Sequence, residues 1–446
     1  MHNLTNTEIT YTLSVLLGND GSVESSAQQH IYYGSAIDAP ACANITIVPY
    51  KSGAEPDLLS KNAQFQLPLQ EINGIPLLFG SPKVDRENGG GIVVHADIIA
   101  SAYFLLTRYE EIIRPDVRDK HGRFPGKESI AFRAGFLRRP IVDEYGKRLR
   151  KWLREAGIDC PEPNQDFRIA LTHDVDVPFQ FDKFSKIWRP TAQALLRNIK
   201  KIHLPIASWL GFARDPLDCF DWILEQNRAV HDALGQDNVK TLFFIIAGGD
   251  SIYDGLYELS SDRVIGLLNR LQQKPSQLGL HASYSAGGNP KRLQTEANAL
   301  RTASGSPITD NRHHFLRWRE PEDVQQLENA GITDDYTLGY ADQVGFRLGV
   351  CRPVRLFDST AQSLTSVTAH PLTIMDASLN RDMYMGLDFE NALEVCKDLA
   401  ARVAEHKGEL VLLWHNTELK DDGVNYHKRL YQSFLKELAV TYRSNP

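Results

Sequence analysis

Residues 168–176 have the sequence RIALTHDVD, an apolar run that ends in two carboxylates two positions apart. The side chains of a strand alternate between its two faces, so Asp174 and Asp176 leave the same face. Two carboxylates crowded at a strand end repel each other unless a cation or a shared proton relieves them. The stretch therefore predicts a buried strand with a metal or proton site at its end. The alternative is a pair of solvated acids that cap the next helix.

Similar apolar runs recur through residues 166–446, separated by stretches with helical spacing. Such an alternation is typical of a parallel sheet covered on both faces. No glycine-rich nucleotide loop follows the first strand, so we expect a barrel-like α/β domain. The expected strands are 169–172, 239–246, 278–281, 308–315, 333–338, 345–350 and 409–415.

Residues 1–162 are expected to form a smaller mixed α/β domain. The polar, proline-rich segment 160–166 separates it from the second domain, residues 166–446. Strands are expected at 9–15, 45–48, 75–79 and 92–95. A helix is expected over 97–111, with Asp97 as its N-cap, and another ends near Leu153.

Composition restricts the class of protein. The net charge is -7 and no basic tract stands out, which argues against a nucleic-acid partner. The five cysteines are scattered, which favours a reducing compartment over a disulfide framework. The N-terminus lacks the basic and apolar regions of a signal peptide, and no apolar run reaches the roughly 20 residues of a membrane span. We therefore expect a cytoplasmic protein.

Further polar side chains stand at the carboxyl ends of the expected strands. In a parallel α/β barrel these ends open onto one mouth, where active sites are built. Each side chain alone could be structural, as a satisfied core histidine or a buried ion pair. Their shared position favours function, and alternation turns His173 and His313 to the opposite side. The candidates are Asp174, Asp176, His281, Arg312, His314 and His415.

The residue types indicate the chemistry. A carboxylate and neutral imidazoles bind Zn²⁺ or a similar cation, which acidifies water and polarises a carbonyl. A carboxylate outside the metal shell can act as general base if an arginine keeps it ionised, and a histidine can protonate a leaving amine. This set suits hydrolysis of an amide or an ester. A phosphoesterase or a glycosidase that uses the acid pair is a weaker reading, since no phosphate-cradling loop is evident.

Four segments, in order, resemble motifs of the polysaccharide deacetylases, the family-four carbohydrate esterases with a NodB-homology domain. They are THDVD at 172–176, HASYS at 281–285, NRHHF at 311–315 and LLWHN at 412–416. The resemblance covers about residues 166–420. Segments 103–111 and 120–125 resemble a domain of unknown function that precedes the barrel in a bacterial subgroup of such proteins.

The resemblance implies a distorted (β/α) barrel and a role for each residue. Asp174 would be the base, Arg312 would orient it, and His415 would be the general acid. Asp176 and His281 would bind a divalent metal, Zn²⁺ first, with Co²⁺ or Ni²⁺ as alternatives. The implied enzyme is a metal-dependent hydrolase that removes an N- or O-acetyl group from an acetylated sugar or glycan intermediate.

One position departs from the family pattern. Ser285 stands where the second motif normally carries another histidine, and serine is a poor zinc ligand. His314 could take its place as the third metal ligand, or water could complete the shell. The alternative function is a degenerate barrel that binds glycan or a partner protein without catalysis. Aromatic side chains that could stack on a sugar are Tyr284, Trp318, Tyr336, Tyr340 and Trp414.

Overall fold

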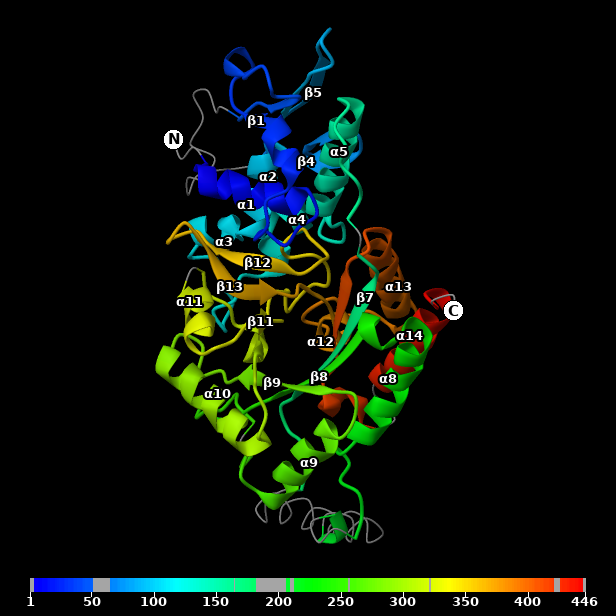
Figure 1. Ribbon diagram of the computed structural model, residues 1–446. Helices are drawn as coiled ribbons and strands as arrows, with labels where there is room; N and C mark the ends of the chain where they lie inside the picture. Colours follow the sequence, from blue (N-terminus) through cyan, green and yellow to red (C-terminus); the bar gives the residue numbers. More distant parts are fainter. Residues whose placement is uncertain are drawn as a thin grey trace.

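The computed structural model describes residues 4–50, 65–163, 165–181, 206–208, 212–255, 257–320, 322–420 and 426–443. The molecule is elongated, with the N-terminal elements stacked on the end of a larger α/β body (Figure 1). None of the helices in these ranges is both long and apolar enough to cross a membrane.

The N-terminal region contains a four-stranded sheet in the order β1-β2-β6-β5 and a small β3-β4 hairpin. The strands expected at 45–48, 75–79 and 92–95 are confirmed as β2, β4 and β6. The strands are β1 (Ile31–Tyr33), β2 (Ile45–Ile47), β3 (Gln70–Ile72), β4 (Ile75–Leu77), β5 (Gly80–Arg86) and β6 (Ile92–Ala96). The helices are α1 (Asn6–Leu16), α2 (Ile98–Leu106), α3 (Tyr109–Ile113), α4 (Ile130–Arg133) and α5 (Ile141–Glu155).

The strand expected at 9–15 is wrong, because this segment lies inside helix α1. A capping box starts the helix: the Thr5 hydroxyl accepts from the Glu8 amide, and the Glu8 carboxylate accepts from the Thr5 amide at 2.7 Å. This T-x-x-E signal outweighs the alternating β-branched residues that follow it. Asp97 is confirmed as an N-cap, accepting from the Ala100 amide, but the helix breaks at Arg108, whose φ is 54°.

The second region is built on a nine-stranded sheet in the order β12-β13-β11-β10-β9-β8-β7-β15-β14. Neighbouring strands are parallel except for the β12-β13 pair. The sheet curls, and helices cover its outer side (Figure 1). The expectation of a barrel-like α/β fold is confirmed.

The strands of this region are β7 (Arg168–Val175), β8 (Val239–Ile245), β9 (Gln277–Ala282), β10 (Asp310–His313), β11 (Asp334–Asp335), β12 (Val354–Asp358), β13 (Ser363–Ala369), β14 (Leu372–Met375) and β15 (Glu409–Leu413). The helices are α8 (Phe220–Leu234), α9 (Asp262–Gln272), α10 (Pro290–Ser304), α11 (Glu322–Asn329), α12 (Asp376–Asn380), α13 (Phe389–Glu405) and α14 (His427–Thr441).

The strand expected at 345–350 is wrong, and strands β12, β13 and β14 were not expected. Gly345 and Gly349 have φ values of 140° and 66°, which interrupt extended backbone in that segment. The run 363–369, which is rich in serine, threonine and valine, forms strand β13 instead.

The chain links the two sides of the curled, open sheet where β13 leads into β14. Only His370 and Pro371 separate the two strands, so the chain passes directly from one side of the sheet to the other. His370, in this connection, contacts a strand on each side of the sheet. Its Nδ1 lies 2.5 Å from the Glu409 carboxylate on β15, and its Nε2 lies 3.0 Å from the Asp334 carboxylate on β11. Burial lowers the pKa of His370, but the Glu409 and Asp334 charges raise it to about 9.

The His370→Gln variant is expected to lower the free energy of unfolding by about 3–5 kcal/mol at pH 7, because Glu409 keeps a buried charge without its partner. Since the pKa of His370 is raised, its contribution is complete below about pH 6.5 and is lost as pH rises through about 9. The difference in the free energy of unfolding between wild type and His370→Gln should therefore decrease above pH 9. Denaturant unfolding across pH measures this.

His95→Gln is the matched control, because His95 pairs with the exposed Asp85. It should cost less than about 1 kcal/mol. An equal loss of unfolding free energy in the two variants would contradict a stabilising role for the buried contacts of His370 with Glu409 and Asp334.

The two regions share one continuous cluster of buried apolar side chains. Buried ion pairs also join them: Glu111 with Arg347 at 2.6 Å, and Asp143 with Arg352 at 2.8 Å. Arg108 makes a third such pair with Glu320. The N-terminal elements are thus firmly packed on the larger region, while the boundary at 160–166 stays a prediction.

Candidate functional site

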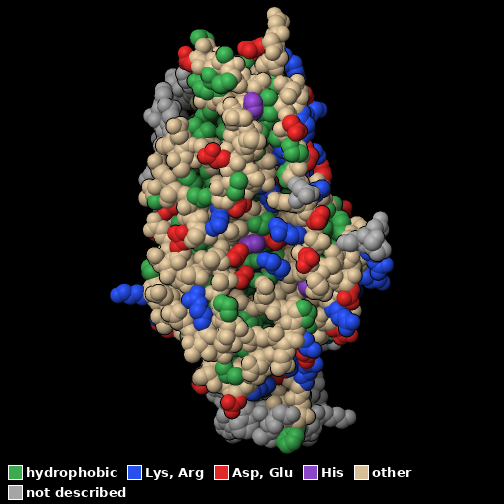
Figure 2. Space-filling view, in the orientation of Figure 1, with side chains coloured by type: hydrophobic (Ala, Val, Ile, Leu, Met, Phe, Trp, Pro, Cys, Tyr) green, Lys and Arg blue, Asp and Glu red, His purple; other side chains and the backbone are tan. Residues whose placement is uncertain are grey.

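Polar side chains converge where six neighbouring parallel strands end. In sheet order these strands are β10, β9, β8, β7, β15 and β14. Acidic, basic and histidine side chains lie close together near the middle of the face seen in Figure 2. The side chains described below are Asp174, Asp176, Asp254, His281, Arg312, His314, Asp376 and His415.

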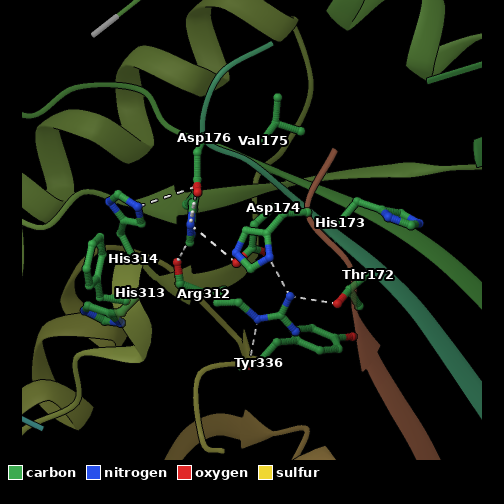
Figure 3. A network of polar contacts seen from close by, with 12 residues as sticks. Thr172, His173, Asp174, Val175, Asp176, Arg312, His313, His314 and Tyr336 are labelled. Atoms are coloured by element: carbon green, nitrogen blue, oxygen red, sulfur yellow. Dashed lines mark hydrogen bonds and ion pairs between the residues drawn. The ribbon is translucent and has the colours of Figure 1, made fainter. Parts of the chain in front are cut away.

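Asp176, His281 and His314 form a group of donors of the kind that can hold a metal ion. One donor atom from each lies within 4.8 Å of the others. Asp176 Oδ1 is 3.3 Å from His281 Nε2 and 3.6 Å from His314 Nε2 (Figure 3). Asp176 follows β7, His281 is in β9, and His314 begins the turn after β10. One carboxylate and two imidazoles are a donor set compatible with a divalent metal.

The bonding of His281 leaves a lone pair aimed into this group. Its Nδ1 lies 2.8 Å from the Arg312 carbonyl oxygen, so Nδ1 carries the proton and Nε2 is an acceptor. Nε2 faces carboxylate oxygens of Asp176 and, at 3.4 Å, of Asp174. Among the residues that the structure describes, His281 Nε2 and Asp176 Oδ1 are buried and have no hydrogen-bond partner. A metal ion or a shared proton between such buried acceptors would stabilise them, and the three donors fit a metal ion.

His314 is held by Asp254, an acid that was not among the predicted site residues. Its Nδ1 lies 3.2 Å from Asp254 Oδ1, which leaves Nε2 on the side of Asp176. Asp254 lies in the loop after β8 and also accepts from the Tyr284 amide at 2.6 Å. Carboxylates often fix metal-binding histidines in this way.

Ser285 supports this arrangement from outside. Its hydroxyl lies 2.6 Å from Asp250 Oδ1 and 3.1 Å from Asp254 Oδ2. It therefore contacts the acid that holds His314. The position where the resemblance expected a histidine ligand serves the neighbouring acid instead.

The Asp176 carboxylate and the His314 imidazole shift each other's pKa, because their charges are opposite in sign. Burial raises the pKa of Asp176, but the positive charge of His314 holds it well below its usual range. Burial lowers the pKa of His314, while the carboxylates of Asp176 and Asp254 raise it to about 9. The two acids thus concentrate negative charge around His314, where a cation would be stabilised.

Asp174 forms a buried ion pair with Arg312. The guanidinium Nη1 lies 2.9 Å from Asp174 Oδ1 and 2.7 Å from the Thr172 hydroxyl, and Nε donates to the Tyr336 carbonyl at 3.0 Å (Figure 3). The Arg312 side chain is fully buried, and that of Asp174 is 3% exposed. The buried guanidinium therefore places a fixed positive charge beside the Asp174 carboxylate.

His415, directly after β15, is oriented by a second acid that sequence reasoning missed. Its Nδ1 lies 2.8 Å from Asp376 Oδ1, and its amide donates to Asp376 Oδ2 at 2.7 Å. Asp376 is fully buried at the start of α12. Burial lowers the pKa of His415, but the Asp376 carboxylate raises it to about 10. His415 is therefore a proton donor at neutral pH, with Nε2 available.

A cavity connects these groups. Its polar lining includes Asp174, Asp176, His314 and His415, and its apolar lining includes Leu316, Met375 and Leu413. Arg123 of the N-terminal region also lines it, together with Arg381, Tyr384 and Glu418. The lining of the cavity thus combines charged and apolar side chains.

Other expected side chains lie away from the cavity. His173 bonds to the Trp414 carbonyl at 3.0 Å, and His313 lies 3.0 Å from Asn311 Nδ2, so both point elsewhere as the alternation predicted. Of the five aromatic candidates, four are buried: Trp318, Tyr336, Tyr340 and Trp414. Only Tyr284 keeps partial exposure, so stacking on a sugar by the other four is wrong.

Comparison with known proteins gives distant similarities. Residues 1–157 match a family of unknown function, DUF7033. No curated protein matches the chain. A solved structure named "putative polysaccharide deacetylase from Mycobacterium smegmatis" is 15% identical with a TM-score of 0.39, covering 64% of this chain and 87% of that one. A 4-alpha-glucanotransferase from Thermococcus litoralis is 13% identical with a TM-score of 0.32, covering 62% of this chain and 38% of that one. These similarities are too distant to assign an activity.

Proposed function

We propose that this protein is a metal-dependent hydrolase that removes an acetyl group from an acetylated sugar, with a NodB-type barrel as its catalytic part. The observation that carries the proposal is the pair of buried acceptors, Asp176 Oδ1 and His281 Nε2, which face each other and have no hydrogen-bond partner in the described part of the chain. His314 supplies the third donor. The N-terminal region, in this view, serves the barrel.

Asp176, His281 and His314 would hold the metal, with Zn²⁺ as the first choice and Co²⁺ or Ni²⁺ as alternatives. When bound, such a cation supplies Lewis acidity and makes water a stronger acid at neutral pH. The His281 Nδ1 bond to the Arg312 carbonyl and the His314 bond to Asp254 fix the tautomers that ligation requires.

Asp174 is the general base in this proposal. It is not needed to complete the three-donor group, and the Arg312 guanidinium lies 2.9 Å from its Oδ1. A carboxylate in this place would accept the proton of the attacking water. The cationic guanidinium contacts only one of its oxygens, Oδ1, while Oδ2 remains on the His281 side.

His415 is the general acid. Asp376 holds its imidazole protonated and binds Nδ1, so Nε2 carries the proton that the leaving amine or alcohol needs. The methyl of an acetyl group fits the apolar wall of Leu316, Met375 and Leu413. An acetylated sugar therefore offers groups for both the charged and the apolar side chains of the lining.

Acetate release tests the proposal. The purified protein, with Zn²⁺ added, is incubated with N-acetylglucosamine oligomers and with O-acetylated sugars, and acetate is measured by an enzymatic assay. We expect release that stops after chelation and returns with metal. Glycan binding without acetate release in either metal state would instead favour the degenerate binding barrel.

The Asp254→Asn variant is expected to bind Zn²⁺ about 10–100-fold more weakly, because His314 loses the charge that orients it. Asp250→Asn is the matched control: Asp250 also accepts from Ser285 but does not bond to His314. Its affinity should stay within about twofold of wild type. Competition with a fluorescent chelator measures both. Equal affinities for the two variants would contradict the role given to Asp254.

A further inference from the structure

A segment of the N-terminal region, residues 119–127, reaches the candidate active site. Arg123 lines the cavity, and its side chain is only 11% exposed. The Asp119 carboxylate fixes its guanidinium, accepting from Nε at 2.8 Å and lying 2.7 Å from Nη2. At the other end of the segment, the Gly126 amide donates to the Asp342 carboxylate at 2.7 Å. The segment is thus anchored at both ends.

Arg123 connects two walls of the cavity. Its Nη1 donates to the Phe315 carbonyl at 3.0 Å, and its Nη2 donates to the Tyr384 hydroxyl at 3.2 Å. Phe315 directly follows the candidate ligand His314, and Tyr384 lines the cavity from the segment after α12. One side chain from the N-terminal region therefore spans the site.

The turn that Arg123 contacts has an unfavourable backbone. Phe315 and Leu316 have φ values of 62° and 53°, in the left-handed region that large side chains seldom adopt. Two such residues in succession need external support. This turn directs the chain out of β10 just after His314, so its conformation sets the position of the imidazole.

The support is reciprocal. Arg317, after the turn, donates from Nε to the His121 carbonyl at 2.9 Å and from Nη1 to the Tyr284 carbonyl at 2.5 Å. The His121 ring packs on the Phe315 ring, with centroids 4.7 Å apart. Each segment thus uses an arginine to hold a backbone carbonyl of the other.

We infer that Arg123 is a positioning residue for the metal site: it holds the left-handed turn at Phe315 so that His314 faces Asp176. The inference rests on the proposed function, since it concerns the same three donors. It gives the N-terminal region a specific task, which is to complete the site of the barrel.

The chemistry requires arginine in particular. The guanidinium offers forked donors that reach Asp119, Phe315 and Tyr384 at once. A lysine keeps the charge and a bond to Asp119, but its single ammonium lacks the fork that serves both walls. Arg123→Lys should therefore preserve folding and still weaken metal binding.

The test measures Zn²⁺ affinity by chelator competition for wild type, Arg123→Ala and Arg123→Lys, with thermal unfolding of each metal-free protein. Arg139→Ala is the control, because Arg139 also binds a carboxylate and a backbone carbonyl, Glu144 and Gly74, away from the cavity. We expect affinity about tenfold or more weaker in both Arg123 variants and unchanged in the control. The unfolding temperature of Arg123→Lys should match that of the control.

The outcomes separate this inference from the proposed function. If wild type binds no Zn²⁺, the proposed function fails. If wild type binds Zn²⁺ and both Arg123 variants bind it equally well, only the positioning role fails. An Arg123→Lys protein that does not fold would also overturn the inference, since Arg123 would then be a residue of general stability. Equal weakening in Arg139→Ala would do the same.

Discussion

The Asp174→Asn variant is expected to lose about 10²–10⁴-fold in kcat while it still binds one equivalent of metal. The amide cannot accept the proton of water, which is the role proposed for this carboxylate. The donors Asp176, His281 and His314 all remain. Stability should also fall, because Arg312 is fully buried and loses the negative charge beside it.

Acetate release, metal content and thermal unfolding are measured together. Asp176→Asn is the matched variant, since it changes the other carboxylate of the same strand end. It should lose metal as well as turnover. If Asp174→Asn retained the wild-type rate, or lost its metal as Asp176→Asn does, Asp174 would not be the base.

A second large effect is expected from Asp376→Asn. In wild type, Asp376 raises the pKa of His415 to about 10, so the acid is protonated throughout the neutral range. Without the carboxylate this pKa should fall toward about 6.5, the ordinary value for histidine. At pH 8 only about 3% of His415 would then be protonated, which lowers the rate about 30-fold.

The sign can be checked in the pH profile of kcat. The alkaline limb should move from near pH 10 in wild type to near pH 6.5 in Asp376→Asn, and the deficit should shrink below pH 6. His415→Gln is the companion variant: it should be slow at every pH and lack this limb. An unchanged limb in Asp376→Asn would show that Asp376 does not control the acid.

Candidate site residues on or next to strands could be predicted from the sequence, because strand order and side-chain alternation decide where these side chains lie. Asp174 and Asp176 lie two residues apart at the end of one strand and contact the same histidine, while His173 and His313 point away. Strand ends of a parallel sheet meet, so side chains from β7, β9, β10 and β15 could be grouped without coordinates.

The supporting acids could not be predicted in this way. Asp254 lies in a loop after β8 and Asp376 follows β14, and neither position has a distinctive local pattern. Asp376 was also missed because β14, the strand that it follows, was not predicted. The contact of Arg123 with Phe315 joins residues 192 positions apart, which only the packing of the two regions determines.

Ser285 lies outside the donor group and contacts an acid that holds one of its histidines. From sequence, a serine in place of a histidine ligand left a relocated ligand, a weaker site and a site without metal all open. In the structure Ser285 contacts Asp254, and His314 occupies the third place in the donor group. The feature that motivated the degenerate barrel is therefore compatible with a complete set of ligands.

The most direct measurement is the Zn²⁺ content of purified protein after incubation with metal and desalting, for wild type, His314→Ala and His313→Ala. The two histidines are neighbours, but only His314 belongs to the donor group, while His313 bonds to Asn311. We predict close to one equivalent in wild type and His313→Ala, and little or none in His314→Ala. No bound metal in wild type, or equal content in the two variants, would contradict a metal site built on Asp176, His281 and His314.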